Sequence, residues 1–137
     1  MLEVQCAGGL VSEPGKLRIL VVEDERHIAR FLQYVLEKAG FHVLVALDGK
    51  TAVDNIDTFR PDGVVLDLVL PDISGTEVLR AIRRSDVCGS AAVVVLSAHT
   101  FEHGADTVDP GGRTVQCPKP IAPSRLLEKL KEFGLGV

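Results

Sequence analysis

Short, nearly continuous apolar runs alternate with amphipathic segments along the chain from Leu17 onward. Such runs are typical of strands buried on both faces of a sheet. The segments between them carry apolar residues at helical spacing, as Ile28, Leu32 and Leu36 do. Because strand–helix alternation with short connections gives right-handed crossovers, we predict an α/β fold, a doubly wound five-stranded parallel sheet with helices on both faces. The predicted strands are residues 17–22, 41–46, 62–67, 91–96 and 114–117.

Start and stop signals support the helices in this pattern. Gly40 follows the first amphipathic segment, where glycine commonly ends a helix. Asp48 and Ser74 are suited to cap the second and third helices, and Glu77 stands three residues after Ser74 as in a capping box. Pro123 opens the last helix at a position where its missing N–H is not needed.

The segment between the fourth and fifth predicted strands fits the pattern poorly. Residues 99–112 contain Asp109–Pro110 and Gly111–Gly112, which are turn signals, and few apolar residues at helical spacing. We therefore expect the fourth helix to be short or irregular, or the segment to be mobile.

Length, charge and composition narrow the class of protein. The 137 residues are enough for one domain, which we assign to residues 17–137 after a flexible tail at residues 1–16. A net charge of −4 with no basic run gives no electrostatic footprint for nucleic acid or an anionic membrane. The three cysteines show no metal-binding spacing. No run resembles a membrane span or a signal peptide, so a cytoplasmic protein is expected.

Four of the five predicted strands end at a chemically capable residue. The first ends at Glu23 and Asp24, the third at Asp67, the fourth at Ser97, and the fifth just before Lys119. Ligands of doubly wound sheets bind at the carboxyl ends of the strands, near the point where the strand order reverses. We therefore expect these side chains to converge on one edge of the sheet.

This combination of residues is suited to phosphoryl chemistry. Carboxylates gathered in one pocket repel each other unless a cation joins them, and Mg²⁺ is the natural hard cation for oxygen ligands. A metal beside Lys119 would bind an anion, and phosphoryl transfer needs mainly charge neutralisation and positioning. Ser97 can donate a hydrogen bond to a phosphoryl oxygen, and Asp67 can act as a nucleophile that forms an acyl phosphate.

From about Leu17 to its end, the chain resembles a response-regulator receiver domain of the kind found in the bacterial chemotaxis regulator. The resemblance implies the flavodoxin-like strand order 2-1-3-4-5. Ser97 and Lys119 also follow Asp67 at the family's spacing. Five site positions in order, Glu23, Asp24, Asp67, Ser97 and Lys119, are a more specific signal than any one short motif. The matching segments are residues 19–25, 64–75, 94–98 and 118–120.

The resemblance implies a role for each matching residue. Asp67 would accept a phosphoryl group from a histidine kinase or a histidine phosphotransfer protein. Asp24, Asp67 and the Val69 backbone carbonyl would bind Mg²⁺, with Glu23 assisting through water. Ser97 and Lys119 would contact the phosphoryl group, and the Lys119–Pro120 peptide would be cis. The domain would assist its own phosphorylation and dephosphorylation without being an enzyme, and would signal by protein contact or onward transfer to an unidentified target, as a monomer or a weak dimer.

Some positions depart from the family's usual pattern, and two others stand where the family tunes the lifetime of the phosphoryl group. The acidic pair is Glu23–Asp24, where Asp–Asp is commoner. Gln116 occupies the switch position, where the family usually has an aromatic residue. Val69 and His99 stand two positions after Asp67 and Ser97, where side chains tune the lifetime of the phosphoryl group.

Two other functions remain open at this stage. A degenerate receiver that binds partners without phosphorylation is favoured by Gln116 and by the poor fourth helix, whereas the intact Asp67, Ser97 and Lys119 oppose it. A hydrolase of the aspartyl-phosphate class would carry a second acid where Val69 stands, and valine cannot transfer protons. Each site residue alone also has a structural explanation as a cap, a turn residue or a solvated lysine. Only their joint occurrence favours phosphoacceptor chemistry.

Overall fold

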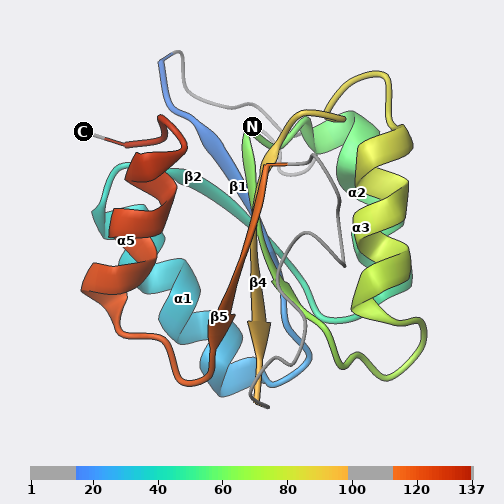
Figure 1. The fold of residues 1–137 in the computed structure, drawn as a ribbon, viewed down its shortest axis with the longest axis horizontal. Helices are drawn as coiled ribbons and strands as arrows, with labels where there is room; N and C mark the ends of the chain where they lie inside the picture. Colours follow the sequence, from blue (N-terminus) through green and yellow to red (C-terminus); the bar gives the residue numbers. More distant parts are fainter. Residues whose placement is uncertain (1–14, 99–112, 137) are drawn as a thin grey trace, which may run out of the picture.

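A computed structural model describes residues 15–98 and 113–136 of the chain. Five parallel strands form one sheet in the order β2-β1-β3-β4-β5, which confirms the predicted topology (Figure 1). The order reverses between β1 and β3, so the crevice expected to hold a ligand lies at the carboxyl ends of these two strands. The strands are β1 (Arg18–Val22), β2 (His42–Ala46), β3 (Gly63–Asp67), β4 (Ala92–Ser97) and β5 (Thr114–Pro118).

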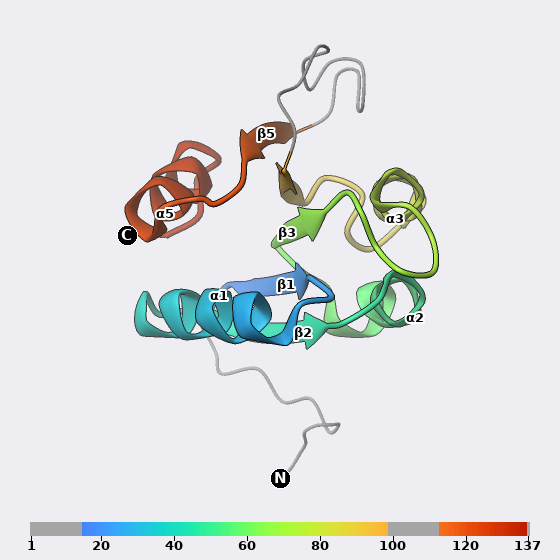
Figure 2. The same ribbon diagram turned by 90° about the horizontal axis from the view of Figure 1, so that it is seen from below.

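Helices cover both faces of the sheet, as predicted. Figure 2 shows α1 and α5 on one face and α2 and α3 on the other. The expectation of a short or irregular fourth helix falls on residues 99–112, which lie outside the described residues, as does most of the predicted N-terminal tail. The helices are α1 (Arg26–Lys38), α2 (Gly49–Phe59), α3 (Gly75–Arg84) and α5 (Pro123–Glu132).

The two faces of the sheet hold two separate apolar cores. Along β1, Leu20 and Val22 point into the core under α2 and α3, while Ile19 and Val21 point into the core under α1 and α5. Strand β3 is buried over its whole length. Full burial of an aliphatic side chain stabilises the fold by about 1.5–3 kcal/mol. The central strands are therefore the part of the molecule on which a site can be held most rigidly.

The helix ends follow the local signals in the sequence. The Asp48 carboxylate accepts a hydrogen bond from the Thr51 N–H at 2.7 Å, and Ser74 Oγ accepts one from the Glu77 N–H at 3.2 Å. Pro123 is the first residue of α5, and Gly40 adopts a φ of +101° just after α1. These caps fix where each helix begins and ends relative to the strand before it. Among the described residues, none of the helices is long and apolar enough to cross a membrane.

Candidate functional site

The strand-end residues meet at one edge of the sheet. Asp67 is the last residue of β3 and Ser97 the last of β4, and the register pairs Asp67 with Leu96 and Ser97 with Pro118. Glu23 follows β1 directly, and its backbone N–H donates to the Ala46 carbonyl of β2 at 3.1 Å. The parallel register therefore places consecutive strand ends side by side, as the sequence predicts.

Lys119 joins the two buried carboxylates of this edge. Its Nζ lies 2.9 Å from Asp67 Oδ2 and 3.1 Å from Glu23 Oε1. Both carboxylate side chains are almost fully buried, whereas the Lys119 side chain is 21% exposed. Glu23 Oε1 makes this ion-pair contact without a well-aligned hydrogen bond. A buried carboxylate oxygen that is incompletely satisfied is available to a further cation or to a water bound to one.

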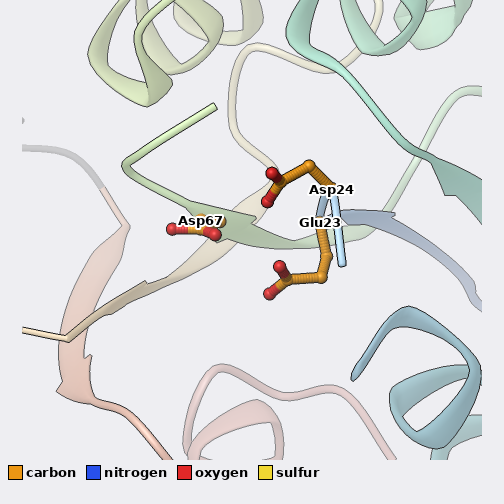
Figure 3. A group of neighbouring side chains, drawn as sticks. All are labelled: Glu23, Asp24 and Asp67. Atoms are coloured by element: carbon orange, nitrogen blue, oxygen red, sulfur yellow. The ribbon is translucent and has the colours of Figure 1, made fainter. Parts of the chain in front are cut away.

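The third carboxylate completes a cluster suited to a metal ion. One oxygen each from Glu23, Asp24 and Asp67 lies within 4.8 Å of the others, and Asp24 is the exposed member (Figure 3). Carboxylate oxygens are the ligands that Mg²⁺ and Ca²⁺ prefer. Because Lys119 provides a single ammonium against three carboxylates, the cluster keeps an excess of negative charge. The residues therefore fit a hard divalent cation at this edge of the sheet.

Burial and pairing shift the ionisation of the two paired groups. Burial raises the pKa of Glu23, and the hydrogen bond from the Glu25 N–H and the contact with Lys119 offset this only in part. Burial also acts to lower the pKa of Lys119, but its hydrogen bond to Asp67 and its contact with Glu23 outweigh that effect and raise the pKa. Lys119 is thus held in its charged form next to the predicted phosphoacceptor.

The loop between β3 and α3 is packed tightly onto the end of β3. The Val69 N–H donates to Asp67 Oδ1 at 3.0 Å, and the Gly75 N–H donates to the Leu68 carbonyl at 2.9 Å. A Cβ atom at Gly75 would lie 2.5 Å from the Asp67 carbonyl oxygen and 2.6 Å from Leu68 Cα. Only glycine fits this approach, which keeps the loop folded over Asp67.

One functional candidate was missed by the sequence interpretation. The carboxylate of Asp72 accepts hydrogen bonds from the backbone N–H groups of Gly49 and Lys50, at 2.9 and 2.8 Å. Desolvation acts to raise the pKa of Asp72, but these hydrogen bonds outweigh it and lower the pKa. From the sequence, Asp72 has no assigned role and lies only within the matching segment of residues 64–75. A capping acid is a recognisable signal, but the sequence does not say that it caps a helix lying earlier in the chain.

The structure also describes most of the other residues that the sequence singles out. The Lys119–Pro120 peptide is cis, as predicted. Ser97 is buried, and its carbonyl accepts the Lys119 N–H at 2.7 Å. Gln116 lies half-buried on β5, paired in register with Val95. His99 lies outside the described residues.

The fold and the site together define a class of doubly wound domain with an acid cluster, a buried aspartate and a lysine at the ends of β1, β3 and β5. Residues 19–131 match the family model described as "Response regulator receiver domain". The chain belongs to this family of two-component signalling domains. Receiver domains are signalling domains that take phosphoryl groups from histidine kinases and bind Mg²⁺ at an acidic site.

Similar proteins point to the same family. The response regulator MprA of Mycolicibacterium vanbaalenii is 35% identical over 115 residues, which are 84% of this chain and 49% of that protein. The DNA-binding response regulator MtrA of Mycobacterium tuberculosis is 35% identical over 119 residues, covering 83% of this chain and 49% of MtrA. This chain thus spans about half of the length of these two curated relatives.

Solved structures share the fold. The receiver domain of the Francisella response regulator 1452 superimposes with a TM-score of 0.74 at 27% identity, over 85% of this chain and 95% of that one. The chemotaxis response regulator CheY4 of Vibrio cholerae gives a TM-score of 0.77 at 25% identity, over 85% of this chain and 98% of that one.

Proposed function

We propose that this domain accepts a phosphoryl group on Asp67 from the phosphohistidine of a kinase or a histidine phosphotransfer protein. A carboxylate oxygen of Asp67 forms a bond to phosphorus, the P–N bond breaks, and the leaving imidazole nitrogen keeps the electron pair. The observation that carries the proposal is the contact of Lys119 Nζ with Asp67 Oδ2. A phosphoryl group on Asp67 would bring its negative oxygens to an ammonium that is already held there.

The surrounding residues have complementary roles in this proposal. Glu23, Asp24, Asp67 and the Val69 backbone carbonyl would hold Mg²⁺, which neutralises charge on the phosphoryl oxygens when bound. The buried Ser97 at the end of β4 would donate its hydroxyl to a phosphoryl oxygen. Glu23 positions Lys119 through the 3.1 Å ion pair. The side chain of Val69, 68% exposed, borders the approach of the water that removes the phosphoryl group.

Phosphorylation with a small donor tests the proposal directly. The protein is incubated with acetyl phosphate and Mg²⁺, and its intact mass is measured. The expected result is one phosphoryl adduct that disappears in Asp67→Asn and in the presence of EDTA. No adduct under conditions in which a known receiver domain is phosphorylated would contradict the proposal.

A degenerate receiver that binds a partner without phosphorylation is the second candidate. Gln116 favours it, because an amide stands at the position where the family usually has an aromatic side chain. The second candidate predicts that a partner binds Asp67→Asn as tightly as the wild type. The relative MtrA is described as a DNA-binding response regulator. Our prediction that this domain itself contacts no nucleic acid, and acts in the cytoplasm, stays a prediction.

A further inference from the structure

The β3–α3 loop, residues 68–74, carries the proposed metal-binding carbonyl of Val69. The Val69 side chain is 68% exposed, so side-chain packing does little to hold this residue in place. The direction of its carbonyl must therefore be fixed by the backbone contacts of the loop. Hydrogen bonds at the inner end of the loop and at its tip link it to the rest of the fold.

Three hydrogen bonds lie at the inner end of the loop. They are the Val69 N–H to Asp67 Oδ1 at 3.0 Å, the Gly75 N–H to the Leu68 carbonyl at 2.9 Å and the Leu68 N–H to the Leu96 carbonyl at 3.2 Å. The first depends on the carboxylate that would react. An acyl phosphate has lost the carboxylate charge, and a charge-assisted hydrogen bond is about twice as strong as a neutral one. The hydrogen bond from the Val69 N–H is thus weakened when Asp67 carries a phosphoryl group, although the loop must then stay in place.

A further contact lies at the tip of the loop and is independent of Asp67. Asp72 accepts the Gly49 N–H through Oδ1 and the Lys50 N–H through Oδ2, at 2.9 and 2.8 Å. These are free N–H groups of the first turn of α2, where the helix dipole also favours an anion. Asp72 therefore links the loop to α2 through both carboxylate oxygens.

Packing at the start of α2 supports this link. A Cβ atom at Gly49 would lie 2.5 Å from Ile73 Cγ1. The glycine lets the helix backbone approach the residue next to Asp72 closely. The loop tip is thus joined to α2 both by hydrogen bonds and by direct contact.

We propose that Asp72 is a positioning residue, which fixes the β3–α3 loop on the N-terminus of α2 and so sets the place of the Val69 carbonyl at the metal site. This inference rests on the proposed function, because it assigns the Val69 carbonyl to Mg²⁺. In this scheme Asp72 itself binds neither the metal nor the phosphoryl group. Its effect is transmitted through the loop backbone.

Asp72→Ala tests the inference, with Asp48→Ala as a matched control. Asp48 caps the same helix through the Thr51 N–H at 2.7 Å, and its loss removes the same charge from the same helix end. Mg²⁺ affinity of the full chain is measured by isothermal titration calorimetry. Groups that orient metal ligands directly change affinity by roughly 10–100-fold. Asp72 acts on the Val69 carbonyl only through the loop backbone. For Asp72→Ala we therefore expect the Mg²⁺ affinity to fall about 3–10-fold further than for Asp48→Ala.

Further measurements separate positioning from a general loss of structure. Amide hydrogen exchange should accelerate at Gly49 and Lys50 in Asp72→Ala, while Thr51 should be the amide affected in Asp48→Ala. Asp72→Asn keeps one acceptor oxygen, so its Mg²⁺ affinity should lie between those of wild type and Asp72→Ala. It also provides the comparison if Asp72→Ala does not fold.

Equal Mg²⁺ affinities in the Asp72 and Asp48 variants would overturn the positioning role. That result is distinguishable from failure of the proposed function. If the wild type binds Mg²⁺ but forms no phosphoryl adduct, the proposed function fails, whereas the role of Asp72 is still decided by the ratio of affinities.

Discussion

The Nζ atom of Lys119 lies 2.9 Å from Asp67 Oδ2, although 52 positions separate the two residues in the chain. The same ammonium contacts Glu23 Oε1 at 3.1 Å. Lys119 therefore reduces the repulsion between two buried carboxylates. The contact is both a structural link between three strand ends and the place where a phosphoryl group would be bound.

Replacing Lys119 by alanine should destabilise the metal-free protein. Loss of one partner of a buried pair costs about 3–5 kcal/mol. Because the Lys119 side chain is 21% exposed, solvent screening should reduce this to about 1–3 kcal/mol. Mg²⁺ binding should not weaken, since a positive charge is removed beside the metal site. Urea unfolding measures the loss of stability, and calorimetry measures Mg²⁺ binding. Lys129→Ala, which removes the ion pair of Lys129 with the exposed Glu132, is the control. A variant that unfolds like wild type and is phosphorylated to the same extent would show that Lys119 has neither role.

Asp67→Asn should abolish the phosphoryl adduct and keep the fold. The amide retains the size of the carboxylate and one oxygen acceptor, but it is not a nucleophile that forms an acyl phosphate. The adduct is followed by intact mass after treatment with acetyl phosphate and Mg²⁺. Asp57→Asn, a change at an exposed residue of α2 that contacts Ser85, is the control and should keep the full adduct. A persistent adduct in Asp67→Asn would place the acceptor on another residue.

Asp24→Asn should remove the stabilisation of the protein by Mg²⁺ while leaving the metal-free protein unchanged. Asp24 is the exposed member of the acid cluster, so the apo fold depends little on it. A ligand present at 100 times its dissociation constant stabilises a protein by about 2.7 kcal/mol. Wild type should therefore melt at a higher temperature with Mg²⁺ than with EDTA, and the variant should show no such difference. Glu25→Gln, which changes the next acid along the chain, should behave like wild type.

Glu23 should make the metal-free protein less stable as the pH rises. Burial raises the pKa of Glu23 above its ordinary value of 4.5, so the native state disfavours the charged form. The protonated Glu23 side chain fits the folded protein better than the charged one does. This contribution to the free energy of unfolding is fully present below the pKa that Glu23 has in the unfolded chain, and it is lost as the pH rises through the higher pKa that Glu23 has in the folded protein. Compared with Glu23→Gln, wild type in EDTA should therefore lose stability over that range. Urea unfolding from pH 4 to about pH 8 measures the difference, and an opposite slope would contradict this assignment.

Gly75→Ala should impair the site through the backbone of β3. The new Cβ atom would lie 2.5 Å from the Asp67 carbonyl oxygen, so the loop or the strand end must move. Overpacking of this kind costs about 1–3 kcal/mol, and Mg²⁺ affinity should fall with it. Thr76→Ala, at the next position of α3, is the control. Unchanged stability and affinity in Gly75→Ala would show that the loop can shift freely without affecting Asp67.

Much of the fold is predictable from the sequence because its signals are local. The buried strands are recognisable as short apolar runs, and the caps at Asp48, Ser74 and Pro123 depend on neighbours within the same turn. The convergence of Glu23, Asp67 and Lys119 is also predictable, since parallel strands with right-handed crossovers have only one edge at their carboxyl ends.

Other features of the site depend on how the elements pack. No local pattern indicates that Asp72 caps α2 rather than its own helix, or that Gly49 has Ile73 against its backbone. Nor does the spacing of residues show that a single lysine is shared by Glu23 and Asp67. The chemical groups at the strand ends can be read from the sequence, because periodicity and capping act over a few residues. Which groups pair with each other follows only from the packed fold, because hydrogen bonds and ion pairs across crossovers depend on distances that are set when helices and sheet pack together.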